Sequence, residues 1–253
     1  MTDGYRTKTS EEIELMRRSG RLLAATHELI AGMMKPGVSS AELDRAAEEF
    51  IRDGGGKPAF KGYRGYPATL CVSFNEQVVH GIPGPRRFVE GDLVGVDCGA
   101  ILEGYYSDMA VTHYVGGEPP AQVDDLMKTT LRSLHKGIEK WRPGNRVGDV
   151  SAAIQKEVES RGFSVVRALV GHGIGTVMHE RGLQIPNYGN AGTGLKIVEG
   201  MTAAIEPMVN MGGYDVRELK DGWTYVTADA SLSCHFEHTV VATADGPRIL
   251  TLP

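Results

Sequence analysis

The chain has 253 residues, which is long enough for one or two domains with a sizeable core. Hydrophobic residues make up 41% and charged residues 23%, a composition that excludes a fibre or a disordered tail. Its 27 basic and 32 acidic residues give a net charge of −5, which argues against binding nucleic acid through phosphate contacts. Three cysteines are too few for a disulfide framework, and no segment approaches the ~20 apolar residues of a membrane span. We therefore expect a soluble, cytoplasmic protein, and we expect its oligomeric state to be a monomer.

Four helices are predicted, in two pairs. The first is expected to have Ser10 as its N-cap, to carry apolar residues from Ile13 onward, and to end at the Lys-Pro-Gly of residues 35–37. Glycine follows each of the other three predicted segments within a few residues, as is typical of helix ends. Those three segments are Ala41–Arg52, Asp124–Trp141 and Asp149–Ser160.

The helix pairs belong to a pattern that occurs twice. The basic-Pro-Gly tripeptide of residues 35–37 recurs 107 residues later, and the Val-Glu-Gly of residues 89–91 recurs 109 residues later. Each Val-Glu-Gly leads into an apolar strand that reaches an acid, Asp97 in the first half and Glu206 in the second. This period is too long for a solenoid. We therefore expect one domain over residues 1–253, built from pseudo-repeats of about 10–115 and 118–245, with an acid from each aimed at their interface.

The first of these strands forms a predicted hairpin that carries two acids. Leu93–Asp97 and Tyr105–Val111 are expected to be its strands, with Glu103-Gly104 as the turn. The expected register places Asp97 directly opposite Asp108, at a Cβ separation of ~4.5–5.5 Å. Two buried carboxylates so close repel, so either one is protonated, as in a two-carboxylate glycosidase, or a cation lies between them. Two solvated surface acids are the third possibility.

Further metal-ligating side chains follow in the second half. A histidine stands among glycines at residues 171–175, Glu206 ends its strand before a proline, and Glu237 lies in the predicted strand His235–Val241. Because five ligands would crowd one tetrahedral zinc, two divalent ions bridged by shared carboxylates, ~3.5–4 Å apart, fit better. His235 shares a face with Glu237, so it is a candidate for supporting a ligand. The five ligand candidates are Asp97, Asp108, His172, Glu206 and Glu237.

The order of these motifs resembles that of the type I methionine aminopeptidases. The resemblance extends from about residue 5 to residue 250 and is carried by residues 75–83, 96–97, 107–108, 171–175, 178–180, 205–207 and 236–238. It implies the α+β pita-bread fold, an antiparallel sheet flanked by helices with an internal pseudo-two-fold axis. It also implies an enzyme that removes the N-terminal methionine from nascent polypeptides, near the ribosome, with a preference for a small second residue.

The same resemblance assigns the metal ligands. It implies that Asp97 binds one ion, that His172 and Glu206 bind the other, and that Asp108 and Glu237 bridge both. The cofactor would be two divalent ions, Co²⁺, Mn²⁺, Fe²⁺ or Zn²⁺, whose bridging hydroxide attacks the first peptide bond.

The resemblance also implies roles in catalysis and substrate binding. Glu206 would accept a proton, His179 would hydrogen-bond the scissile carbonyl oxygen, and His80 would lie at the scissile amide nitrogen. Sulfur–aromatic contacts would suit a thioether side chain in an apolar slot. The slot is expected to be lined by Phe60, Tyr63, Tyr66, Cys71, Met178 and Trp223.

Two alternatives share the motifs. A peptidase of the same fold that cleaves Xaa-Pro bonds would use the same metal ligands, although the compact length disfavours it. A binding module that has lost its metals is disfavoured because all five ligands and both histidines are present. One departure from the family pattern is Arg181, just after the His179-Glu180 motif, which could alter how residues beyond the first are received.

Overall fold

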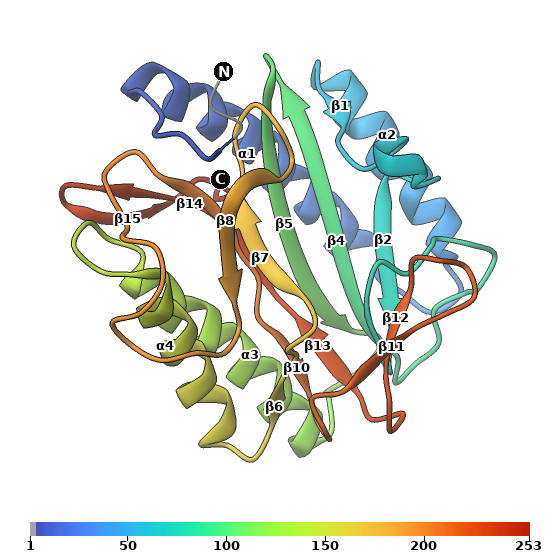
Figure 1. Ribbon diagram of the computed structural model, residues 1–253. Helices are drawn as coiled ribbons and strands as arrows, with labels where there is room; N and C mark the ends of the chain where they lie inside the picture. The colour runs from blue at the N-terminus through green and yellow to red at the C-terminus, as the bar shows by residue number, and fades with distance from the viewer. Residues whose placement is uncertain (1–3) are drawn as a thin grey trace.

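In the computed structural model, which describes residues 4–253, the central element is a nine-stranded sheet (Figure 1). Its strands follow the order β1-β4-β5-β14-β9-β7-β8, with β2 paired to β4 and β15 to β14, and neighbouring strands are antiparallel. Their bounds are β1 Lys57–Pro58, β2 Leu70–Phe74, β4 Leu93–Leu102, β5 Tyr105–Tyr114, β7 Val170–Gly173, β8 Glu180–Pro186, β9 Thr202–Ile205, β14 Glu237–Thr243 and β15 Gly246–Ile249.

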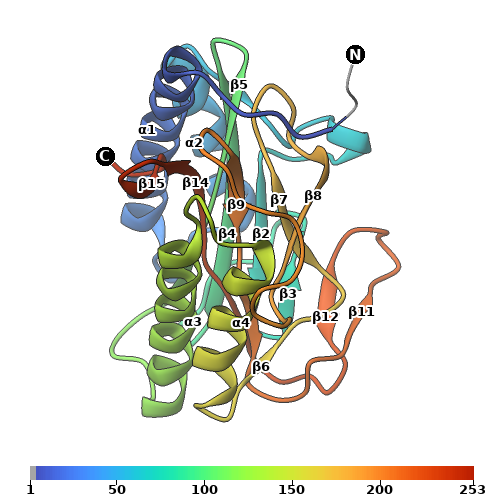
Figure 2. The same ribbon diagram turned by 60° about the vertical axis from the view of Figure 1, so that its left-hand side comes forward.

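Two small sheets extend the structure at one end. One has the order β13-β10-β6 and the other β11-β12-β3. Their bounds are β3 Gln77–Val79, β6 Ser164–Val165, β10 Met208–Asn210, β11 Val216–Glu218, β12 Tyr225–Thr227 and β13 Ser233–His235. The hairpin of β11 and β12 projects from the side of the sheet opposite to α1 and α3 (Figure 2).

All four predicted helices are confirmed, with ends that differ by a few residues. They are α1 Ser10–Met33, α2 Ser40–Asp53, α3 Ala121–Lys140 and α4 Val147–Glu159; a short 3₁₀ turn covers Tyr63–Gly65. The expectation that Ser10 caps the first helix is wrong. Thr9 is the N-cap, because its hydroxyl accepts from the Glu12 amide while the Glu12 carboxylate accepts from the Thr9 amide, a reciprocal capping box.

The helices cover one face of the sheet and leave the other for polar side chains. In β4, Val94, Val96 and Cys98 pack in one apolar cluster with Leu23 of α1 and Leu43 of α2. Because successive strand residues point to opposite faces, Asp97 and Gly99 point away from these helices. In the second half, alternate residues of β9 and β14 pack in the same way in a cluster with α3 and α4. The division into two pseudo-repeats stays a prediction.

The hairpin of β4 and β5 differs from its expected register. Asp97 pairs with Ala110, and Asp108 with Gly99, so the two acids are diagonal neighbours on one face. The turn has two residues, Glu103 and Gly104, with φ of 52° and 84°, the left-handed geometry of a tight hairpin turn. Leu102 and Tyr105 form the last pair before the turn. The centre of the turn is therefore one residue further along the chain than in the register that places the two acids opposite each other. The expected direct pairing was therefore wrong.

No helix among residues 4–253 combines the length and the apolar character needed to cross a membrane.

Candidate functional site

Two neighbouring rows of same-face residues run across the sheet where the two halves of the chain meet. In the first row, Ala110 of β5 pairs with Asp97 of β4 on one side and with Glu237 of β14 on the other. The small alanine therefore leaves open space between two carboxylates.

The second row lies two residues along the strands. Gly99 of β4 pairs with Asp108, whose backbone amide and carbonyl both bond the Thr239 hydroxyl of β14. Thr239 pairs with Ala204 of β9, which pairs with His172 of β7. Glycine and alanine again separate the candidate ligands. Glu206 follows β9 two residues after Ala204, so it extends the same face beside Glu237.

The polar groups of these rows converge. The His172 Nε2 lies 3.6 Å from Oδ2 of Asp108 and 3.7 Å from Oε1 of Glu206. Two groups of three residues have ligand atoms that all lie within 4.8 Å of one another: Asp108, His172 and Glu237, and Glu206, His235 and Glu237. Glu237 belongs to both groups. Asp97 lies diagonally beside Asp108 on the same face of the hairpin and lines the same cavity, and the charge of Asp108 contributes to raising the pKa of Asp97.

The buried carboxyl groups of this cluster must be neutralised by protons or by a cation. Burial raises the pKa of Asp108 and of Glu206 to about 8, and burial together with neighbouring carboxylates raises the pKa of Asp97 and of Glu237. Within residues 4–253, one oxygen of Asp97, of Asp108 and of Glu237 is buried without a hydrogen-bond partner. Orphaned acceptors in an oxygen-rich set that includes imidazole fit divalent metal ions.

The raised pKa values predict how metal binding depends on pH. Between the ordinary values of 3.8 and 4.5 and the folded value of about 8, metal-free folded protein holds protons on Asp108 and Glu206 that the unfolded chain has released. The metal-free protein therefore loses stability as pH rises through this window. Metal ions displace these protons, so their binding tightens over the same range.

We therefore expect the Tm difference between Mn²⁺-loaded and chelator-treated protein to be larger at pH 8 than at pH 5.5. Differential scanning fluorimetry at constant ionic strength measures it, with Mg²⁺ as a weakly imidazole-binding comparison. A Tm difference that does not change with pH would contradict the assignment of these buried carboxyls to a metal.

Two histidines at the cluster have a polar neighbour at Nδ1. The Nδ1 of His172 lies 3.1 Å from the Gly173 carbonyl oxygen, so this nitrogen donates and Nε2 presents its lone pair to the carboxylates. The Nδ1 of His179 lies 2.8 Å from the Tyr63 hydroxyl. Burial is the largest cause that lowers the pKa of His179, to about 3, so His179 is neutral at pH 7. A tyrosine hydroxyl can donate to Nδ1 or accept from it; where it donates, the His179 Nε2 carries the proton and can itself donate.

A cavity of about 280 Å³ opens onto the cluster, and all thirteen site residues predicted from the sequence line it. Its apolar part contains Phe60, Cys71 and Met178, with Trp223 set edge-on against Tyr66 at 5.0 Å between ring centroids. Tyr66 is fixed by its hydroxyl, which donates to the carbonyl oxygens of Leu70 and Gly81. The cavity is thus polar at the carboxylates and aromatic and sulfur-containing beside them.

His80 lies in the wall of this cavity, directly after β3. Its φ of 60° is in the left-handed region, which a non-glycine residue adopts only when its surroundings hold it there. Its ring meets the Tyr225 ring edge-on, at 6.1 Å between centroids. Burial lowers the pKa of His80, so its neutral form is favoured.

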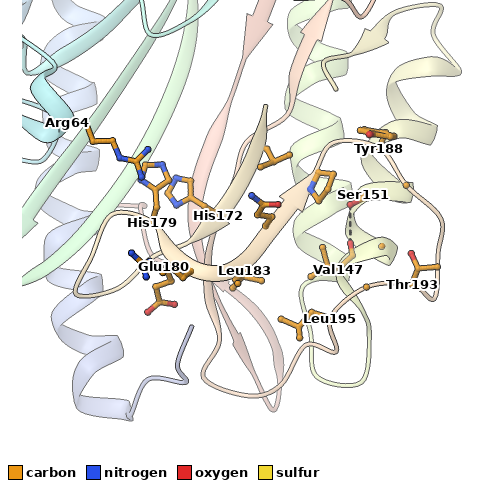
Figure 3. A pocket seen from close by; sticks show the side chains of 18 residues that line it. Arg64, Val147, Ser151, His172, His179, Glu180, Leu183, Tyr188, Thr193 and Leu195 are labelled. Atoms are coloured by element: carbon orange, nitrogen blue, oxygen red, sulfur yellow. Dashed lines mark hydrogen bonds between the residues drawn. The ribbon is translucent and has the colours of Figure 1, made fainter. Parts of the chain in front are cut away.

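A wider groove of about 820 Å³ begins at the same histidines and passes β8 (Figure 3). His172 and His179 lie at one end, Leu183 lies in the middle, and Tyr188 and Thr193 lie at the other end beside α4. Arg181, the departure from the family motif, is one of the lining residues. The groove therefore connects the cluster to the surface.

Sequence reasoning underestimated His235. The expected continuous strand His235–Val241 is divided at Phe236, because β13 pairs with β10 whereas β14 pairs with β5 and β9. His235 is buried, and its Nε2 reaches the carboxylates of Glu206 and Glu237. The two-residue spacing to Glu237 was the signal, but spacing alone does not give the direction or depth of a side chain.

Comparison with known proteins places this arrangement in a family. The model of metallopeptidase family M24 matches residues 14–244. The chain belongs to this family. Among its M24 relatives, the methionine aminopeptidase of Clostridium perfringens is 50% identical over 97% of this chain and 98% of its own length, and methionine aminopeptidase 1 of Bacillus subtilis is 48% identical over 96% and 98%.

The M24 fold is equally well matched. The crystal structure of methionine aminopeptidase from Thermotoga maritima superposes with a TM-score of 0.96 at 46% identity, covering 98% of this chain and 100% of that one. Prolidase from Pyrococcus furiosus superposes with a TM-score of 0.79 at 23% identity, over 98% of this chain and 65% of that one, which supports the fold alone. The predicted family resemblance and the pita-bread fold are confirmed.

Proposed function

We propose that this chain is a metal-dependent aminopeptidase that removes the N-terminal methionine from nascent proteins and peptides, preferring a small second residue. The observation that carries the proposal is one cavity that joins a buried carboxylate–imidazole cluster to an apolar, sulfur-containing slot. The relatives named methionine aminopeptidase, at 43–50% identity over nearly the whole chain, support the same substrate. The likeness to prolidases, at 23% identity, gives Xaa-Pro cleavage less support.

Two divalent ions would be held by the five predicted ligands. Asp97 would bind one ion, His172 and Glu206 the other, and Asp108 and Glu237 would bridge both. When bound, the ions would supply Lewis acidity and lower the pKa of a water molecule. Co²⁺, Mn²⁺, Fe²⁺ and Zn²⁺ all suit this donor set, with zinc least suited to so many oxygens.

The remaining polar residues act on the substrate. Glu206 would accept the proton of the attacking water, because its carboxylate borders both the cluster and the cavity. His179 would donate from Nε2 to the scissile carbonyl oxygen as negative charge develops there. His80, from the opposite wall, would donate to the amine that departs.

The methionine side chain would occupy the apolar slot. Cys71, Met178 and the aromatic rings offer polarisable contacts to a thioether, at ~0.3–1.5 kcal/mol for each sulfur–aromatic pair. The free amine of the substrate would lie at the carboxylates, which explains cleavage at N-termini only. The rest of the polypeptide would leave along the groove past β8. A nascent chain near the ribosome in the cytoplasm is the corresponding partner, and we propose a monomer that recognises no nucleic acid sequence.

The test compares two peptides and one metal cycle. We expect release of free methionine from Met-Ala-Ser, no cleavage of Gly-Pro, loss of activity with a chelator and recovery with Co²⁺ or Mn²⁺. Acetyl-Met-Ala-Ser, which lacks the free amine, is the matched control and should be inert. Preferred cleavage of Gly-Pro would instead support the Xaa-Pro alternative, and activity that survives chelation would contradict the metal site.

Replacing Tyr63 by phenylalanine tests how His179 is oriented. The 2.8 Å hydrogen bond to Nδ1 disappears while the aromatic ring stays in the cavity. We expect kcat to fall roughly fivefold, the effect of one hydrogen bond of about 1 kcal/mol, with little change in KM. Steady-state kinetics on Met-Ala-Ser measures both, and Tyr214→Phe, at an exposed tyrosine that lines neither the cavity nor the groove, is the control. A raised KM with unchanged kcat would restrict Tyr63 to the methionine slot.

A further inference from the structure

A buried histidine outside the proposed ligand set lies against it. His235 is 3% exposed, and its Nε2 is among the buried atoms of residues 4–253 that have no hydrogen-bond partner. This nitrogen is 3.8 Å from Oε2 of Glu206 and 3.8 Å from Oε2 of Glu237. Both distances exceed the ~2.7–3.2 Å of a hydrogen bond. They are close to the separation of two atoms that each lie ~2.0–2.2 Å from a shared ion.

The environment of His235 repeats that of His172. The His172 Nε2 lies 3.6 Å and 3.7 Å from carboxylate oxygens of Asp108 and Glu206. The two imidazoles face different oxygens of Glu206, Oε1 for His172 and Oε2 for His235. Each histidine forms, with Glu237 and one further acid, a group whose ligand atoms lie within 4.8 Å of one another. Glu206 therefore stands between two nitrogen donors.

The backbone of His235 is held in place by a neighbouring strand. The Thr112 hydroxyl of β5 donates to the His235 carbonyl oxygen at 2.7 Å and accepts from the His235 amide at 3.0 Å. Thr112 lies two residues beyond Ala110, on the same face of β5. The His235 ring nitrogen is therefore buried, has no hydrogen-bond partner and is carried by a fixed backbone. These are the properties of a preorganised electron-pair donor to a metal ion.

We propose that His235 is a second imidazole ligand of the metal centre, binding through Nε2 an ion that Glu206 and Glu237 also hold. The inference rests on the proposed function and adds a donor to its ligand set. Imidazole suits Fe²⁺, Co²⁺ and Zn²⁺, whereas carboxylate oxygens suit Mn²⁺. His235 therefore shifts the preference of this centre toward the former ions.

A crystal structure of the Co²⁺-loaded protein, with anomalous scattering recorded at the cobalt edge, tests the ligation directly. We expect a cobalt ion within about 2.3 Å of the His235 Nε2. Cobalt bound by the five other ligands, with His235 only hydrogen-bonded to a carboxylate, would overturn this inference and leave the proposed function standing. Absence of cobalt from the whole cluster would contradict both.

Titration calorimetry tests the metal preference with a matched pair of variants. His238→Gln is the control, because His238 is also buried but its Nδ1 lies 2.8 Å from the Thr251 hydroxyl. We expect His235→Gln to weaken Co²⁺ binding at least tenfold and Mn²⁺ binding less, and His238→Gln to change neither. Equal losses for both metals would contradict ligation, since a positioning role does not discriminate between them. If His235→Gln fails to fold, the crystal structure of the unmodified protein decides.

Discussion

Asp108→Asn and Glu237→Gln are expected to abolish activity far more completely than Asp97→Asn. Glu237 is 2% exposed and belongs to both groups of convergent ligands, and Asp108, at 3%, lies 3.6 Å from the His172 nitrogen. Asp97 is half-buried at one end of its row. Replacing a carboxylate that bridges two ions by an amide would weaken the binding of both. Removing a hydrogen-bond partner of a metal ligand costs ~10–100-fold in metal affinity or activity, and we expect the loss of activity here to be larger.

The measurement pairs kcat/KM with metal content by mass spectrometry. The two bridging variants should retain less than the full complement of metal, and Asp97→Asn should retain more. Asp92→Asn is the control, because this buried acid pairs with Arg86 outside the cluster. Equal activity losses in all three variants, with metal content unchanged, would rule out the bridging roles.

His179→Ala is expected to separate catalysis from metal binding. His179 is exposed to the cavity, is neutral at pH 7 and bonds Tyr63 through Nδ1, so its Nε2–H tautomer can donate to a developing oxyanion without being a ligand. Removing such a donor lowers turnover by ~10²–10³, or ~2.7–4 kcal/mol. The loss should appear in kcat and kcat/KM together, as for an interaction made mainly in the transition state.

The metal content of the unmodified protein and the affinity for free methionine should survive in this variant. Calorimetry with methionine and metal analysis check these points, and His135→Ala, an exposed helix position, is the control. Normal turnover would make His179 a bystander. Loss of an ion would make it a ligand.

The helices and the motif residues could be predicted because their signals are local. Capping residues, apolar periodicity and Pro-Gly ends lie within a few residues of the helices they define. The hairpin register could not be predicted in the same way. It depends on Glu103 adopting a positive φ, which a non-glycine residue seldom does. Moving the centre of the turn by one residue changes the residue that pairs with Asp97.

Other features depend on contacts between distant segments. The link between Tyr63 and His179 joins the 3₁₀ turn to the loop before β8. The depth of His235 depends on Thr112, a partner on another strand. The motifs indicated which residues gather in the cavity, but not which hydroxyl sets the proton of which ring.

The two rows that carry the proposed ligands cross the junction of β5 and β14, which belong to opposite halves of the chain. Asp97 and Asp108 are on the first side of this junction, and the other ligands are on the second. Contacts between segments so distant in sequence slow folding, because the loop between them must be closed first. The complete binding site therefore does not exist until the two halves have docked. Divalent ions are accordingly expected to leave the refolding rate nearly unchanged and to slow unfolding, because they bind only the native state. They would therefore increase the kinetic stability of the folded protein.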